Sequence, residues 1–284
     1  MALPAAETDA MIKRILVALS GTPLTESAVQ RALELAAVHG AEITGVTDLD
    51  LAKVANVGPV PMGAGAAATE LVEHRLQITE QLVTEAIERF ETACTKADVS
   101  FGVVRETGNP YEMLTSLCRY HDLTVAGLRG LFEYGIFHNP DDVLIQLIAK
   151  GVRPILAVAQ EHRPVRRVLA AYSGSMESAK ALKRFVQMRL WPDLTLKIVC
   201  FDKGGDAEGL LADAAGYCRS HGYEAEVEHV DGSPIKGLLE HAGSWKADLV
   251  VMGSSSRARI FQHLLGDTTL HAVRHAEIPL FLTQ

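Results

Sequence analysis

Short apolar runs alternate with stretches of helical spacing along the chain, and the whole alternation occurs twice. In the first half, this pattern predicts strands at 12–19, 41–49, 99–105, 122–127 and 153–159, and helices at 24–39, 69–95, 110–120 and 140–150. In the second half, it predicts strands at 166–172, 194–201, 223–230, 248–253 and 278–283, and helices at 176–190, 206–221, 234–244 and 267–276. Strands that alternate with helices form parallel sheets covered on both faces, so we expect an α/β fold.

Local motifs repeat together with the elements, which indicates two copies of one domain. The first strand of each half enters a helix through a Ser-Gly turn, at 20–22 and again at 173–175. A later strand of each half begins with Asp-Leu and ends in Gly, at 122–127 and again at 248–253. Each half therefore predicts a doubly wound, five-stranded parallel sheet, whose ligand crevice lies at the carboxyl ends of the strands.

We place the first copy of the domain at residues 11–159 and the second copy at 165–284, joined by a short polar linker. The copies differ in length after the second strand. Residues 50–68 of the first copy are rich in Gly, Pro and Ala and predict a loop before a long helix. The second copy has only Lys203-Gly204-Gly205 at the corresponding place, so its loop and helix are expected to be shorter.

Composition narrows the classes of partner. The chain of 284 residues is long enough for two domains with cores of their own, and its net charge is −8. A negative surface argues against nucleic acid and against anionic membranes as partners. No apolar run is long enough to span a membrane, and the first residues lack the pattern of a secretory signal, so we expect a cytoplasmic protein. Without a C-x-x-C pair, the four cysteines are expected to be reduced thiols: Cys94, Cys118, Cys200 and Cys218.

Small and polar residues follow the fourth strand of the second copy, between Gly253 and the helix that opens at Gly266. Small residues let the backbone approach a phosphate closely, and the free amides at a helix start attract an anion. Hydroxyl and guanidinium groups add further donors, from Ser254, Ser256, Arg257, Arg259 and Thr268. The pattern predicts a phosphate-binding loop at this place.

Two other interpretations concern the same segment. The segment can be only a helix start, with Asp267 or Thr268 as the capping side chain. In the same helix, His271 and His275 stand four residues apart, which is a spacing that can hold zinc. No Glu or Cys stands at a partnering offset, so a solvated helix face is favoured and no metal site is predicted.

With these motifs, the chain resembles a tandem universal stress protein. That family carries Gly-x2-Gly-x9-Gly-Ser/Thr after its fourth strand, and the second copy is similar through Gly253, Ser256, Gly266, Asp267 and Thr268. Ser256 and Asp267 depart from the pattern. The resemblance covers essentially all of both copies and implies a Rossmann-like, adenine nucleotide alpha hydrolase-like fold. It also implies that the two copies pair through their last strands, as a pseudo-dimer within one chain.

The resemblance implies ATP, with Mg²⁺, as the ligand of the second copy. Nucleotide-binding members usually carry an Asp at the end of the first strand, where this chain has Ser20 and Ser173. The candidate nucleotide-binding residues are Tyr172, Ser173, Gly174, Ser175, Gly232, Gly253, Ser254, Ser256, Arg257, Gly266, Asp267 and Thr268.

The first copy departs further from the family pattern. Pro140 replaces the third Gly, and two acids, Asp141 and Asp142, follow it. Proline lacks an amide donor, and the acids repel a phosphate. We therefore expect a degenerate site in the first copy, at Ser20, Gly21, Thr22, Gly127, Arg129 and Gly130.

The residues and the resemblance together favour a stress-response protein that senses or sequesters a small ligand without robust turnover, with no catalytic residues. Two chains are expected to be able to associate as a homodimer. One alternative is a partner-binding protein that has lost both sites. The other is an adenylating enzyme, because residues 173–178 (Ser-Gly-Ser-Met-Glu-Ser) are similar to the Ser-Gly-Gly-x-Asp-Ser loop of ATP pyrophosphatases.

Overall fold

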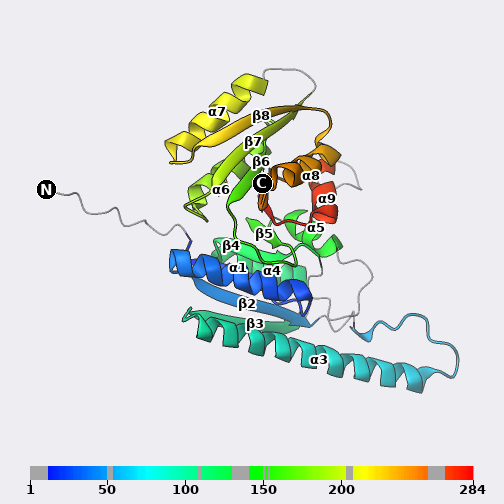
Figure 1. Ribbon diagram of the computed structural model, residues 1–284. Coiled ribbons are helices and arrows are strands. Elements are labelled where there is room, and N and C mark those ends of the chain that lie inside the picture. The colour runs from blue at the N-terminus through cyan, green and yellow to red at the C-terminus, as the bar shows by residue number, and fades with distance from the viewer. Residues whose placement is uncertain are drawn as a thin grey trace.

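In the described part of this computed structural model, ten strands form one continuous sheet, in the order β3-β2-β1-β4-β5-β10-β9-β6-β7-β8 (Figure 1). The structure describes residues 12–49, 54–107, 110–129, 141–149, 151–152, 154–202, 207–254 and 266–283. The strands are β1 (Arg14–Ala18), β2 (Glu42–Leu49), β3 (Phe101–Thr107), β4 (Leu123–Gly127), β5 (Ile155–Val158), β6 (Arg167–Ala171), β7 (Thr195–Asp202), β8 (Ala225–Asp231), β9 (Leu249–Gly253) and β10 (Leu280–Thr283). Within each half all pairings are parallel, which confirms the predicted pair of doubly wound, five-stranded sheets.

Helices cover both faces of the sheet, and their apolar side chains form two cores. One core joins α1, α3, α6 and α7 to the sheet, and the other joins α4, α5, α8, α9 and Val83 of α3 to it. The described helices are α1 (Pro23–His39), α3 (Gly65–Lys96), α4 (Pro110–Leu117), the 3₁₀ turn η1 (Cys118–Tyr120), α5 (Asp141–Ala149), α6 (Met176–Met188), α7 (Ala207–Ser220), α8 (Pro234–Trp245) and α9 (Asp267–His275). Their positions match the predicted helices closely.

The central strands are apolar throughout because both of their faces are buried. In β1, Ile15 and Val17 point into the first core, while Leu16 and Ala18 point into the second, and none is more than 1% exposed. Successive side chains of a strand point to opposite faces, so a strand between two helix layers needs a continuous apolar run. This is why the strands could be located from hydrophobicity alone.

The two halves meet where β5 and β10 pair antiparallel, with Leu280 opposite Ala157, Phe281 opposite Leu156 and Leu282 opposite Ile155. The predicted pseudo-dimer through the last strands is therefore confirmed. All of these side chains are buried, and the Phe281 ring packs edge-on against Phe185 of α6 at 5.4 Å between centroids. The pairing gives each terminal strand a partner and makes both cores continuous across the join.

A polar cluster also ties the halves together. The carboxylate of Glu34 in α1 accepts hydrogen bonds from Trp191 Nε1 at 2.7 Å and from the linker residue His162 Nε2 at 3.0 Å. It also pairs with Arg31 Nη1 at 2.6 Å. Arg31 is only 2% exposed, and burial lowers the pKa of its guanidinium. Because a buried charge that loses its partner is costly, Glu34 holds α1, the linker and the second half in one arrangement.

The expectation of a loop up to residue 68 is wrong at its end, because α3 already begins at Gly65. The three alanines that follow are strong helix formers, and they extend the helix although the surrounding segment is rich in Gly and Pro. With 32 residues, α3 is much longer than the 14-residue α7, and it runs beyond the end of the sheet (Figure 1). The predicted shortening of the second copy lies at this place.

The Asp of the repeated Asp-Leu motif has a structural role in both halves. Asp122 Oδ2 accepts the backbone amides of Lys13 at 2.8 Å and Arg14 at 3.0 Å. Asp248 Oδ2 accepts the amides of Arg166 at 2.9 Å and Arg167 at 2.8 Å in the same way. The carboxylate at the start of one strand therefore fixes the start of its neighbour, β1 or β6.

We predict that Asp248→Asn lowers the free energy of unfolding by about 1–3 kcal/mol, because one carboxylate oxygen holds two amides. Chemical denaturation of the full chain measures this change. Asp193→Asn, at an exposed turn, is the control and is expected to be nearly neutral. Equal effects of the two substitutions would show that the Asp248 contacts add nothing to stability.

Candidate functional site

The strand order reverses between β6 and β9 in the second half and between β1 and β4 in the first. In sheets of this kind, ligands bind outside the carboxyl ends of the strands at such a switch point. Three segments of the second half lie there: the β6–α6 turn, the end of β9 and the start of α9. Thr269, in the first turn of α9, donates its hydroxyl to the Gly253 carbonyl at 3.1 Å, so the last two segments are in contact.

Gly253 is required by packing. A Cβ at this residue would lie 2.5 Å from the carbonyl oxygen of Glu177 and 2.9 Å from the amide nitrogen of Ser178. The start of α6 therefore lies directly against the end of β9. Gly127 is equivalent in the first half, where a Cβ would lie 2.8 Å from Leu24 Cβ. The glycine at this position has a close-packing role in both copies.

A cluster of hydroxyl groups occupies the strand-to-helix turn in both copies. Ser173 Oγ donates to Ser175 Oγ at 3.1 Å, and the Ser173 amide donates to Ser178 Oγ at 3.2 Å. Ser173 and Ser175 are exposed to solvent, whereas Ser178 is buried. Ser178 is not among the candidate residues predicted from the sequence, although the repeated spacing Ser-x-Ser/Thr-x-x-Ser/Thr was a signal for it.

Among the described residues, no side chain caps the start of α9. Its N-cap residue is Gly266, so the interpretation of Asp267 or Thr268 as the capping side chain is wrong. The Leu270 amide donates a hydrogen bond to the Gly266 carbonyl at 3.0 Å, and this bond begins the helical pattern. The amides of Asp267 and Thr268 belong to the first turn, whose N–H groups have no partner within a helix. Asp267 is exposed, and its negative charge at the helix start disfavours an anion there.

Other candidate residues of the second copy lie away from this point or are already bonded. Ser254 is 1% exposed, and both its amide (2.8 Å) and its hydroxyl (3.3 Å) donate to the Thr283 carbonyl. Tyr172 is partly buried against the first core, and burial raises the pKa of its phenol. Gly232 follows β8, which is separated from β6 by β7. Ser256 and Arg257 lie outside the described residues.

In the first copy, the candidate residues form internal contacts. Ser20 is 1% exposed, and its hydroxyl bonds to those of Thr22 at 3.0 Å and Thr25 at 2.9 Å. Arg129 Nη2 donates to the carbonyls of Arg274 at 3.0 Å and Ala276 at 2.9 Å. Arg129 therefore binds the C-terminal end of α9 in the other half, where carbonyls attract a cation. Gly130 lies outside the described residues, and Gly21 forms the exposed, positive-φ corner of the turn.

The carboxyl edge of the first half faces the amino edge of the second across the β5–β10 pairing. A hollow of about 970 Å³ lies between these edges. The Thr22 and Arg129 segments form one wall, and the segment that ends at Pro279 forms the other. The charged residues that line it are Arg129, Glu161, Arg163, Asp248 and Glu277. Arg163 and Glu161 pair with each other, and Asp248 holds the backbone amides at the start of β6.

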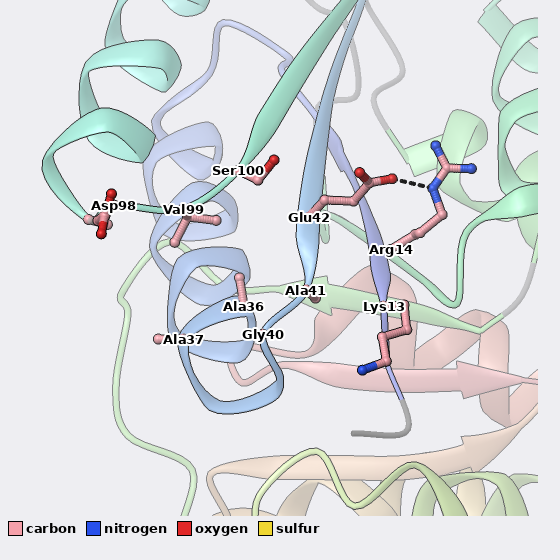
Figure 2. Close-up of a pocket in the computed structure, with 11 residues that line it drawn as sticks. Lys13, Arg14, Ala36, Ala37, Gly40, Ala41, Glu42, Asp98, Val99 and Ser100 are labelled. Carbon is pink, nitrogen blue, oxygen red and sulfur yellow. Dashed lines mark hydrogen bonds and ion pairs between the residues drawn. The ribbon is translucent and has the colours of Figure 1, made fainter. Parts of the chain in front are cut away.

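A second hollow, of about 630 Å³, lies at the amino ends of the strands of the first half (Figure 2). It is bordered by the end of α1, by Ser100 and by the Arg14–Glu42 ion pair, which measures 2.5 Å between Nε and Oε1. Both partners of that pair are about half exposed, so the pair contributes little to stability. Because this is the edge away from the switch point, it is not the candidate site.

Histidines of α9 stack on each other. The rings of His271 and His275 lie 4.2 Å apart, and desolvation together with the neighbouring His275 lowers the pKa of His271. Within the described part of the chain, no group of three or more His, Cys, Asp or Glu side chains gathers as a metal site would. Within the same part, no helix is long and apolar enough to cross a membrane.

Comparison with known proteins agrees with this architecture. The model of the Universal stress protein family matches residues 11–146 and 202–284. A universal stress protein from Archaeoglobus fulgidus DSM 4304 is 18% identical, with a TM-score of 0.67 over 95% of this chain and 98% of that chain. A functionally unknown protein from Pseudomonas aeruginosa PAO1 is 15% identical, with a TM-score of 0.58 over 97% of this chain and 94% of that chain. No curated protein matched.

A universal stress protein solved in complex with cAMP matches about half of the chain. It is 24% identical, with a TM-score of 0.39 over 43% of this chain and 98% of that chain. The two full-length matches, at 18% and 15% identity, show a shared fold.

We predict that Gly253→Ala lowers the free energy of unfolding by about 1–3 kcal/mol, since its Cβ would overlap the Glu177 carbonyl. Gly243→Ala is the matched control, because a Cβ there meets nothing within 4 Å and lies inside α8. That control should gain about 0.5–1 kcal/mol. Urea denaturation measures both, and a neutral Gly253→Ala would mean that α6 does not press on β9.

Proposed function

The chain belongs to the universal stress protein family, and on that premise we propose that its second copy binds an adenine nucleotide, ATP with Mg²⁺, as a sensor of cellular state. The observation that carries this proposal is the start of α9. A helix whose N-cap is Gly266 begins at the switch point of the sheet, and no side chain of the described residues caps its first amides. Such a start favours a phosphate group.

The neighbouring turn suits the rest of a nucleotide. Ser173 and Ser175 present exposed hydroxyls one strand away from the end of β9, and hydroxyls of this kind bond to a ribose or to a base edge. The close approach of α6 to Gly253 brings this turn beside the α9 start. Phosphates at α9 and a nucleoside at the serine turn would thus span the switch point.

Binding is proposed for the second copy and not for the first. In the first copy Ser20 is buried, and Arg129 is held by two carbonyls of the other half. In addition, the residue before Asp141, the first residue of α5, is a proline where the family pattern has a glycine. These features leave the first copy fewer donors for an anion.

We propose that the chain binds the nucleotide without robust turnover and that it acts in the cytoplasm. The adenylating alternative rests on the loop after β6. There Ser175 acts as the N-cap of α6 and accepts the Ser178 amide at 3.2 Å, so this side chain is used in starting the helix. A pyrophosphate-binding loop needs small residues that let its backbone approach the ligand closely. The cap therefore favours a structural role for this serine.

We predict that Asp267→Ser tightens binding of Mg²⁺–ATP roughly 2- to 5-fold, because it removes one negative charge at the helix start without removing the amides. Isothermal titration calorimetry of the full chain measures the change. Asp141→Ser, at the corresponding position of the first copy, is the matched control and should leave the affinity unaltered.

Absence of any ATP binding by the wild-type chain and by Asp267→Ser would contradict the proposal and favour a partner-binding protein. Equal effects of Asp267→Ser and Asp141→Ser would contradict the assignment to the second copy. Steady release of pyrophosphate from ATP would favour the adenylating enzyme.

A further inference from the structure

A hollow of about 470 Å³ opens between α1 and α3 in the first half, on the face away from α4 and α5. Its floor is apolar and buried, formed by Val29, Ala86 and Phe90, with Ala93 beside them. The Gly21–Thr22 turn closes one end. A volume of this order is typical of sites for small molecules.

The polar groups at the mouth of the hollow pair along their own helices. Gln30 Nε2 donates to Glu26 Oε1 at 3.3 Å on α1. Arg89 Nη2 pairs with Glu85 Oε2 at 3.1 Å on α3. Each of these contacts joins residues four apart on one helix, so neither spans the gap between the helices. The mouth carries two acids and one base, which disfavours an anionic ligand.

In the second copy, the corresponding space between α6 and α7 is filled by side chains. We call this space between the two helices the seam. Strand registers give the correspondence, because Ile43 pairs with Phe101 in the first half as Leu196 pairs with Ala225 in the second. On this alignment, Leu210 of α7 corresponds to Ala86 of α3, and Tyr217 corresponds to Ala93. Both large side chains of the second copy are therefore replaced by methyl groups in the first.

Leu210 and Tyr217 fill the seam between α6 and α7. Leu210 Cδ1 would lie 2.8 Å from a Cβ on Gly174, so the leucine lies directly over the turn. The hydroxyl of Tyr217 accepts from Gln187 Nε2 at 3.0 Å, and the ammonium of Lys183 lies 5.6 Å from the tyrosine ring centre. These contacts link α7 to α6.

Phe90 of the first copy does not fill the space that Leu210 and Tyr217 fill in the second copy. It corresponds to Ala214, and its ring packs toward the sheet, where Cε1 would be 2.7 Å from a Cβ on Gly45. Its centroid lies 5.7 Å from that of Phe101 of β3, in an edge-on contact. The extra volume of Phe90 is thus accommodated by Gly45 on the inner side, and the outer space at Ala86 and Ala93 remains.

We propose that this hollow binds a neutral small molecule that combines an aromatic ring with a short branched alkyl group, such as a substituted phenol. The second copy fills the corresponding space with an isobutyl group and a phenol from its own chain. The ligand would occupy the space that Leu210 and Tyr217 fill in the second copy. Gln30, which stands where Lys183 stands in the second copy, would be its polar partner at the mouth. The site is separate from the proposed nucleotide site and does not depend on it.

The test uses the full chain and two probes, 4-isopropylphenol and 4-hydroxybenzoate, titrated by protein-observed NMR. 4-Isopropylphenol is expected to shift resonances of α1 and α3, and the shifts should saturate. The anionic 4-hydroxybenzoate should bind at least about tenfold more weakly, because the mouth is acidic. The double substitution Ala86→Leu and Ala93→Tyr, which copies the second half, should abolish the binding. Ala93→Tyr alone, at a partly exposed position, provides the same test with less risk to folding.

The reverse exchange is the matched control. Leu210→Ala with Tyr217→Ala should open the α6–α7 seam and add a second equivalent of 4-isopropylphenol. The proposal is overturned if the wild-type chain does not bind this probe, or if Ala93→Tyr binds it as well as the wild type does. Shifts confined to residues outside α1 and α3 would also overturn it.

Discussion

The antiparallel pairing of β5 and β10 is the contact on which the rest of the molecule depends. Three residue pairs between these strands join two parallel sheets, bury Phe281 and Leu156 at the join and make two helix layers continuous. The pairing also sets the carboxyl edge of one half against the amino edge of the other. Arg129 can reach the carbonyls at the end of α9 only because of this arrangement, and Glu34 can reach Trp191 for the same reason.

The two copies retain the contacts that start and end their central strands and diverge in what surrounds them. In both copies an aspartate fixes the start of the first strand, while a hydroxyl cluster and a close-packed glycine lie at the carboxyl ends of the strands. The helix after the second strand differs most. It is long and carries small residues over the seam in the first copy, whereas it is short and closes the seam in the second. The copies thus offer two distinct surfaces on one scaffold.

Much of the fold could be predicted because its signals are local and are given twice. Apolar runs located strands buried on both faces, and the repeat identified which segments correspond. The start of α3 at Gly65 was missed, since glycine and proline nearby masked the helix-forming alanines. The role of Arg129 could not be predicted, because its partners at 274 and 276 become neighbours only after the halves pair. The capping interpretation of Asp267 is wrong because the chain enters the helix at Gly266, whose extended backbone makes it the N-cap, so Asp267 is already in the first turn.

We propose that a nucleotide is held at the switch point of the second copy alone. Hydrogen–deuterium exchange of the full chain, with and without saturating Mg²⁺–ATP, tests this directly, since exchange locates protection along the backbone. We predict slower exchange at residues 173–178 and 266–270, with no change at 20–25 or 127–129. Protection at the first-copy turn, or none at the start of α9, would contradict the claim.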